Sequence, residues 1–161
     1  AREIESLMER GEFPTEPIDV AALAESKRRD VERDYPGVEI EASIPASAWA
    51  SANPMIESAA ENVIENAVEH NDSEHPVLGL AVDVTDRHVT LRVADNGPGL
   101  PEEEVAVLRR GRETDLEHAS GLGLWLVNWI VTESSGEVDF ERNEPRGSVV
   151  SIRLSRTDPP G

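Results

Sequence analysis

Polar side chains recur every four residues along one segment of this chain, the predicted helix 53–71. Its apolar residues form two neighbouring columns, and at about 100° per residue these columns make one buried face. A column of glutamates then lies opposite that face, in water, and a polar column lies at the half-buried rim. The polar column consists of Ser58, Asn62, Asn66 and His70. Asn is a mediocre helix former, so two amides one turn apart at such a rim favour a binding site over a solvated edge.

A carboxylate and two glycines follow a predicted β-hairpin, in the sequence Asp95-Asn96-Gly97-Pro98-Gly99. A turn is the simplest interpretation. Gly97 and Gly99 also let the backbone approach a ligand closely. Asp95, at the strand end, suits the exocyclic amine of adenine and repels the carbonyl oxygen that guanine presents in the same place. A Rossmann motif is a weaker alternative, because the third glycine is missing and acidic residues follow.

The most apolar segment of the chain is a predicted buried helix that opens at Ser120-Gly121-Leu122-Gly123-Leu124. Glycines at a buried helix N-terminus leave backbone N–H groups beside the positive end of the helix dipole, which suits phosphates. Close packing of the helix is the alternative explanation.

A long, strongly charged segment, 100–119, separates the two glycine motifs. It is too long for an ordinary loop inside a small domain, so we expect a lid. The lid holds Arg109, Arg110 and Arg112, each of which, taken singly, also fits a solvated surface helix.

The elements that must position these motifs alternate between helix and strand patterns. Asn53 is the expected N-cap of the amide-bearing helix, and Pro54 suits its first position. The other predicted elements are helix 20–33 capped by Asp19, a turn at 36–37, and strands 38–44, 77–85, 89–94, 137–141 and 148–154. The pattern predicts one α/β domain.

Composition excludes several classes of function. The 161 residues suffice for one domain, they include no Cys, and their net charge of -18 makes nucleic acid and anionic membranes poor partners. No apolar run is long enough to span a bilayer, so we expect no direct membrane insertion. Lys27 is the only lysine and has no phosphate-loop context. Acid excess and scarce lysine together predict adaptation to high salt, with an ordinary acidic domain as the alternative.

The three motifs, in this order, resemble those of the GHKL ATPases, a group that contains DNA gyrase, MutL, a heat-shock chaperone and the sensor histidine kinases. The resemblance covers 18–154, and each motif alone is weak. Asn62 stands where gyrase-like members carry a Glu general base, which favours the histidine kinases. The segment 121–125 is similar to the second glycine box of archaeal sensor kinases, so with the acid excess we expect a halophilic archaeal source.

The resemblance implies a Bergerat fold, an α/β two-layer sandwich whose mixed, mostly antiparallel sheet is covered by helices on one face. It implies ATP and Mg²⁺ as cofactors. Asn62 and Asn66 would be the catalytic pair, with Asn66 holding Mg²⁺ through its amide oxygen, and Asp95 would read adenine. The expected ATP-binding set is Asn62, Asn66, His70, Asp95, Gly97, Gly99, Leu100, Ser120, Gly121, Leu122, Gly123 and Leu124.

The expected function follows from the same resemblance: transfer of the γ-phosphoryl group of Mg-ATP to a histidine on a helical dimerisation domain absent from this chain. We expect residues 1–11 to end that domain's helix, 12–17 to be a linker, 18–155 the ATP-binding domain and 156–161 a tail. The expected partners are the phosphoacceptor domain and a response regulator, in the cytoplasm, with membrane anchoring of the full-length protein left open. A stand-alone anti-sigma-type serine kinase and a non-catalytic nucleotide-binding module are the alternatives.

Three departures from the family pattern bear on this expectation. The predicted lid lacks the Phe that many members carry, Glu69 stands at a position that is often basic, and no histidine precedes the domain in a phosphoacceptor context. The acceptor histidine is itself the nucleophile, so no general base is assigned, and Glu65 is the one weak candidate for that role.

Overall fold

The computed structural model describes residues 14–99 and 124–160. Its strands are β1 (Glu16–Asp19), β2 (Glu39–Ser43), β3 (Trp49–Ala52), β4 (Val77–Val84), β5 (His88–Asp95), β6 (Glu137–Arg142) and β7 (Ser148–Arg156), and its helices are α2 (Val20–Asp34), α3 (Ile56–Glu69) and α6 (Leu124–Glu133). Within the described residues, the predicted helices and hairpins are thus present, with ends that differ by a few residues.

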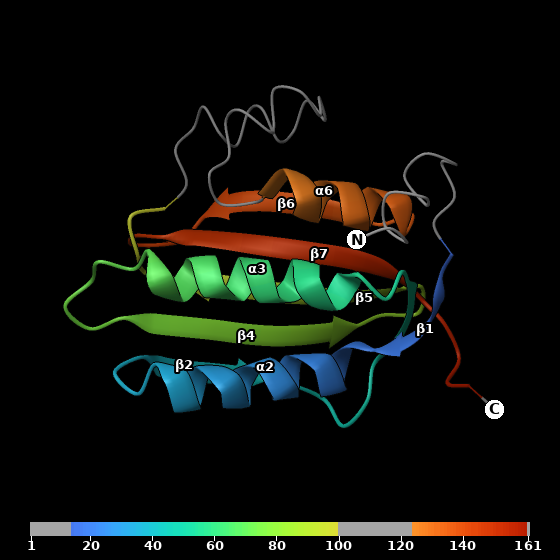
Figure 1. Ribbon diagram of the computed structural model, residues 1–161, viewed down its shortest axis with the longest axis horizontal. Coiled ribbons are helices and arrows are strands. Elements are labelled where there is room, and N and C mark those ends of the chain that lie inside the picture. The colour runs from blue at the N-terminus through green and yellow to red at the C-terminus, as the bar shows by residue number, and fades with distance from the viewer. Residues whose placement is uncertain (1–13, 100–123, 161) are drawn as a thin grey trace, which may run out of the picture.

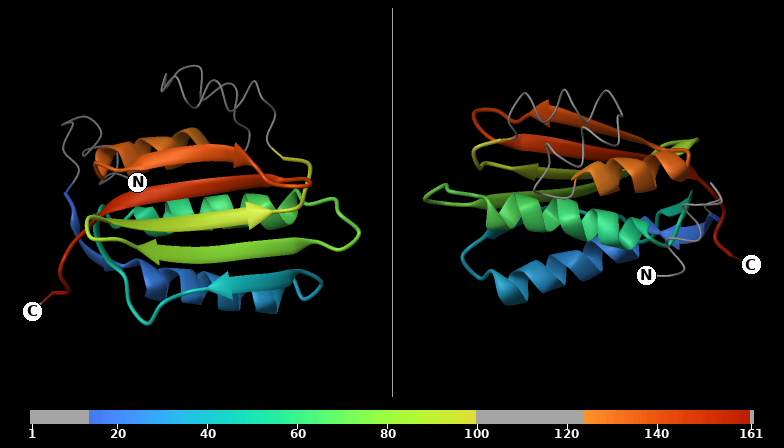
Figure 2. Two further views of the ribbon diagram at one scale, coloured as in Figure 1. Left: turned by 180° about the vertical axis from the view of Figure 1, so that it is seen from behind. Right: turned by 45° about the horizontal axis from the view of Figure 1, so that its top comes forward.

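The described strands form one mixed sheet in the order β1-β3-β7-β5-β4-β2, and β6 also pairs with β7. The β2–β4 pair is parallel and the others are antiparallel. Helices α2, α3 and α6 lie side by side on one face of the sheet, with α3 in the middle (Figure 1). The view from behind shows the opposite face, which no described helix covers (Figure 2, left). The predicted two-layer α/β sandwich is confirmed.

The core lies between the sheet and the helix layer. Alternate residues of the central strands β4, β5 and β7 point into it, as the period of two in their sequences requires. The middle helix α3 contributes both of its apolar columns to this core. The buried residues of α3 are Ile56, Ala59, Ala60, Val63, Ile64, Ala67 and Val68.

Strands β1 and β3 were not predicted from the sequence. Both have four residues, and β3 reads Trp-Ala-Ser-Ala, which offers little side-chain alternation. These segments are strands because of their pairing: β1 lies antiparallel to β3, and β3 pairs with the end of β7 and so extends the sheet. Residues 16–17 therefore belong to a strand, although the sequence indicated a linker there.

The start of α3 differs from the prediction. The helix begins at Ile56, so Asn53 is not its cap; the Asn53 amide instead closes the preceding turn by accepting a hydrogen bond from the Met55 N–H at 2.8 Å. Asn53 is 2% exposed, and it also donates to the Pro14 carbonyl at 3.0 Å. By contrast, Asp19 caps α2 as predicted, by accepting from the first backbone N–H groups of that helix.

The glutamate column of α3 does not simply face water, as the sequence analysis expected. It borders α2, because α3 is the middle helix of the layer. Lys27 of α2 is 7% exposed and places its ammonium 3.5 Å from Glu57 and 3.8 Å from Glu61. Tyr35 donates a hydrogen bond to Glu69 at 3.0 Å. A single-helix projection cannot reveal such a neighbour.

Strands β2 and β6 carry acidic residues in alternation. In the part of the chain that the structure describes, each of these strands pairs with one other strand, β2 with β4 and β6 with β7. The exposed acids are Glu39 and Glu41 in β2 and Glu137, Asp139 and Glu141 in β6. Among the described helices, none combines the length and the apolar character that crossing a membrane requires.

Candidate functional site

The amide column of α3 lies at the rim of the core. Asn62 and Asn66 are half-buried, and the Asn66 Nδ2 donates a hydrogen bond to the Asn62 Oδ1 at 3.2 Å. His70 follows the last helical residue and is exposed, and its backbone N–H bonds to the Asn66 carbonyl. The two amides therefore form one polar unit near the C-terminal end of the helix.

Asp95 ends β5 and is 9% exposed. Its Oδ1 accepts from the Gly97 N–H at 2.9 Å and from the Ser148 N–H at 3.4 Å, and its Oδ2 accepts from the Ser148 hydroxyl at 2.9 Å. The Asn143 side chain donates to the Asp95 carbonyl at 2.8 Å. A buried carboxylate held by this many donors has a fixed orientation.

Sequence reasoning missed Ser148 and Asn143. The hairpin β4–β5 and the strand pair β6–β7 were both predicted, but the pairing of β5 with β7 was not. In that pairing Ala94 lies opposite Val149, which brings the start of β7 beside Asp95. The local signal was weak: Ser148 is a small polar residue at the first position of an otherwise apolar strand.

The two glycines after Asp95 are favoured by the local structure, Gly97 by close packing and Gly99 by its backbone conformation. A β-carbon on Gly97 would lie 3.2 Å from the Asn71 Cα and 3.3 Å from the Asp95 Oδ1. Gly99 has a φ of +80°, a conformation that residues with a β-carbon rarely adopt. Gly97 therefore lets the Asp95 segment lie directly against the residues that follow α3.

These contacts bring the carboxylate and the amide column to one end of the molecule. Both β5 and α3 end there, and α6 runs antiparallel to α3, so its N-terminus points toward the same end (Figures 1 and 2). The positive end of the α6 dipole is thus directed toward the end of the molecule at which α3 ends.

Part of the predicted set lies outside the described residues. This holds for Leu100, Ser120, Gly121, Leu122, Gly123, and the lid with Arg109, Arg110 and Arg112. Leu124 is the first residue of α6. The phosphate-binding role predicted for the second glycine motif is therefore not tested by the geometry.

Glu65 lies in a groove between α2 and α3. The groove is lined by Lys27, Asp30, Val31, Arg33, Asp34, Tyr35, Glu61, Ile64 and Glu65, so neither Asn62 nor Asn66 contributes to it. Partial burial raises the pKa of Glu65, and the negative charges of Glu61 and Glu69 raise it further. These contacts relate Glu65 to helix packing rather than to the amide column.

Metal-binding side chains of the usual kind are not clustered in the described parts of the chain. Within 14–99 and 124–160, no group of three or more His, Cys, Asp or Glu side chains is arranged to hold a metal ion. A metal in this site would depend on neutral amide oxygens and on oxygens of a ligand. Mg²⁺ accepts such a ligand set, because it takes few protein oxygens together with phosphates and water.

The family described as "Histidine kinase-, DNA gyrase B-, and HSP90-like ATPase" matches residues 52–158. The sensor protein CreC of Escherichia coli (strain K12) is 30% identical over 160 residues, which cover 93% of this chain and 33% of CreC. The sensor-type histidine kinase PrrB of Mycobacterium leprae is 29% identical over 144 residues, 86% of this chain and 32% of PrrB. The chain thus spans about a third of the length of these relatives.

Solved structures share the fold. The ATP-binding domain of PrrB from Mycobacterium tuberculosis superposes with a TM-score of 0.72 at 24% identity, covering 89% of this chain and 98% of that one. The catalytic domain of the histidine kinase ThkA gives a TM-score of 0.76 at 18% identity, covering 91% and 100%. The chain belongs to the histidine kinase-, DNA gyrase B- and HSP90-like ATPase family and is a catalytic ATP-binding domain of the sensor histidine kinase type.

Proposed function

We propose that this domain binds Mg-ATP and transfers the γ-phosphoryl group to a histidine of a separate helical domain. The observation that supports it best is the buried, oriented carboxylate of Asp95 beside the end of the amide-bearing helix α3. The carboxylate suits the base of a nucleotide, and the amides of α3 suit the metal ion and the phosphates at the other end of the same nucleotide. The anti-sigma-type serine kinase would share this site, so the acceptor distinguishes the two.

The Asp95 carboxylate retains capacity for an amine. Its Oδ1 receives two N–H groups, whereas its Oδ2 receives the Ser148 hydroxyl alone among the described donors. A carboxylate oxygen accepts two hydrogen bonds, so Oδ2 has room for the exocyclic amine of adenine. Gly97 and Gly99 would border the base, and His70 would approach the nucleotide from the end of α3.

The amide pair suits a metal ion. The hydrogen bond from the Asn66 Nδ2 to the Asn62 Oδ1 sets the orientation of the Asn66 amide. Asn66 would hold Mg²⁺ through its own amide oxygen, with Asn62 orienting it. When bound, Mg²⁺ would neutralise charge that develops on the transferred phosphoryl group. The remaining task of the protein is to position the phosphates, for which the α6 N-terminus and the glycines 121 and 123 are suited.

The surrounding protein is part of this proposal. Residues 1–11 would end a phosphoacceptor helix, and 12–15 would link it to the ATP-binding domain. That domain starts with β1 at Glu16 and ends with β7 at Arg156, so 157–161 would form a tail. A phosphoacceptor domain and a response regulator would be the partners, in the cytoplasm. The acid excess supports a halophilic source.

Radiolabelled ATP tests the acceptor. The isolated chain should bind Mg-ATP without labelling itself, and the helical hairpin of the parent protein, added as a separate chain, should acquire acid-labile label. The rate should rise with hairpin concentration, because the effective concentration provided by the tether is lost. Acid-stable label on a partner serine would support the anti-sigma alternative instead. Binding without transfer to the hairpin at any concentration would support the non-catalytic module.

Replacement of Asn66 by Ala tests the metal. Affinity for ATP in the presence of Mg²⁺ should fall by about tenfold or more, whereas affinity with a chelator should change little, because the lost oxygen contacts the metal and not the nucleotide. Ser58→Ala is the matched control, since Ser58 occupies the same column two turns earlier and is exposed. Equal losses with and without Mg²⁺ would assign Asn66 to packing.

A further inference from the structure

Asn96, between the carboxylate and the first glycine of the Asp-Gly motif, uses its whole amide. Its Oδ1 accepts from the Asn71 Nδ2 at 2.8 Å and from the Val77 N–H at 2.9 Å. Its Nδ2 donates to the His75 carbonyl at 2.9 Å and to the Ser73 hydroxyl at 3.4 Å. Both acceptor and both donor positions of the side chain are therefore engaged.

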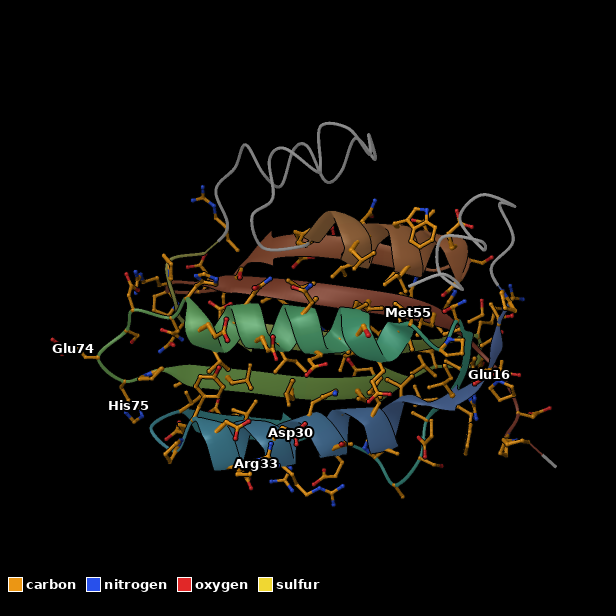
Figure 3. All side chains as sticks on the ribbon, viewed as in Figure 1. Glu16, Asp30, Arg33, Met55, Glu74 and His75 are labelled. Atoms are coloured by element: carbon orange, nitrogen blue, oxygen red, sulfur yellow. The ribbon has the colours of Figure 1, made fainter. Side chains whose placement is uncertain are left out.

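All four partners lie on the connection between α3 and β4, residues 70–76, or at the first residue of β4. The connection is folded around this amide, because the Asn71 Oδ1 also accepts from the Ser73 N–H at 2.9 Å. Figure 3 labels Glu74 and His75 on it, at the end of the molecule where α3 and β5 end. A side chain next to Asp95 thus holds the segment that leaves the amide-bearing helix.

The turn between β6 and β7 also contacts the connection between α3 and β4. Arg146, in the turn between β6 and β7, lies 2.7 Å from the Asp72 carboxylate and reaches the Asn96 carbonyl at 3.5 Å. Gly97 allows direct contact with Asn71, as described above. The end of α3 is consequently fixed against the Asp95 segment from two sides.

We propose that Asn96 is a positioning residue for the nucleotide: it sets the end of α3 relative to Asp95. This rests on the proposed function of the site. Adenine at Asp95 and the Mg²⁺-bound phosphates at Asn66 belong to one ligand of limited reach, so a shift of α3 along its axis moves one set of contacts away from the other. The apolar face of α3 holds the helix against the sheet, and the hydrogen bonds of Asn96 to the connection that follows α3 fix its position along its axis.

The proposal is tested by the affinities of adenosine and of Mg-ATP, measured by calorimetry. Asn96→Ala should weaken Mg-ATP by about tenfold or more and adenosine by less than about threefold, because adenosine has no phosphates and does not need the amide pair of α3 in register with Asp95. Asn96→Asp keeps both acceptor contacts but sets an oxygen against the His75 carbonyl, and should give the same split. Asp19→Ala, which removes the cap of α2 at the opposite end of the molecule, should lower the melting temperature and leave both affinities unchanged.

A double variant separates positioning from general destabilisation. Asn71→Ala removes one partner of the same network, so Asn71→Ala combined with Asn96→Ala should weaken Mg-ATP little more than Asn96→Ala alone. Equal losses for adenosine and Mg-ATP, additive effects, or unchanged binding in the folded variants would overturn the role of Asn96 and leave the proposed function intact. Failure of the unmodified chain to bind either ligand would overturn both.

Discussion

Asp95 is the residue on which nucleotide selection should depend. Asp95→Asn is expected to weaken ATP binding by about ten- to a hundredfold and to abolish discrimination against GTP, since a charged hydrogen bond in a closed pocket contributes about 1.5–3 kcal/mol. Titration calorimetry with both nucleotides checks this. Asp83→Asn is a suitable control, because Asp83 lies on the same hairpin but pairs with Arg92 on an exposed surface. Unchanged ATP affinity in Asp95→Asn would refute the adenine assignment.

Ser148 should act on the nucleotide through Asp95. Ser148→Ala removes the hydroxyl that orients the Oδ2 of Asp95, and the expected loss of ATP affinity is smaller, about three- to tenfold, because the two N–H groups still hold Oδ1. Calorimetry again measures it. Ser151→Ala, three residues further along β7 and opposite Arg92, provides the comparison and should leave affinity unchanged. If both serine variants bind alike, Ser148 has no such role.

Among individual residues, the sequence alone predicted those site residues whose types are unusual for the helix or strand end in which they lie. Two amides on a helix rim and a carboxylate before two glycines are visible in the sequence alone. Ser148 and Asn143 were missed because they reach Asp95 through strand pairing across about fifty residues of chain. Asn96 was seen as part of a turn, because its four partners lie on a loop whose path the sequence does not specify.

At the level of helices and strands, the groove between α2 and α3 should make the stability of the fold depend on pH. A folded-state pKa above the unfolded value means that the folded chain holds the proton of Glu65 more tightly. The contribution of protonated Glu65 to folding stability is fully present below the pKa of Glu65 in the unfolded chain, about 4.3. It is lost as the pH rises through the pKa of Glu65 in the folded chain. Charged Glu65, near Glu61 and Glu69, therefore disfavours the packed pair of helices at neutral pH.

Glu65→Gln should accordingly unfold at higher denaturant concentration than the parent at about pH 7, and the difference should vanish below about pH 4. Denaturant titrations at several pH values check this. Glu57→Gln is the comparison, because it removes a carboxylate 3.5 Å from the Lys27 ammonium and should bring no gain at neutral pH. A difference between Glu65→Gln and the parent that persists unchanged in acid would contradict the explanation.

Elements with strong periodicity were predicted from the sequence, and elements defined by their neighbours were not. Helices α2, α3 and α6 and the strands β4, β5, β6 and β7 carry clear patterns. The short strands β1 and β3 exist through pairing, and the environment of the glutamate column depends on the position of α2. Both facts follow from tertiary arrangement, which no single segment encodes.

For the whole molecule, charge is the dominant property. A net charge of -18 on 161 residues should make folding depend on salt. Repulsion extends over about 10 Å at 0.1 M ionic strength and over about 3 Å at 1 M. Thermal melts in increasing KCl should therefore rise steeply up to molar concentrations. A cooperative melt at low salt that equals the one in about 2 M KCl would refute this.

The acidic edge strands have a consequence for self-association. If a second copy added a strand to β2 or β6, carboxylates of the two copies would lie on neighbouring strands, about 4.8 Å apart. Their repulsion disfavours edge-to-edge pairing, and the residues concerned are Glu39, Glu41, Glu137, Asp139 and Glu141. That protection is electrostatic and weakens under the same ions that favour the compact chain. Crystallisation and aggregation should consequently begin at these two edges, and at lower protein concentration as the salt concentration rises.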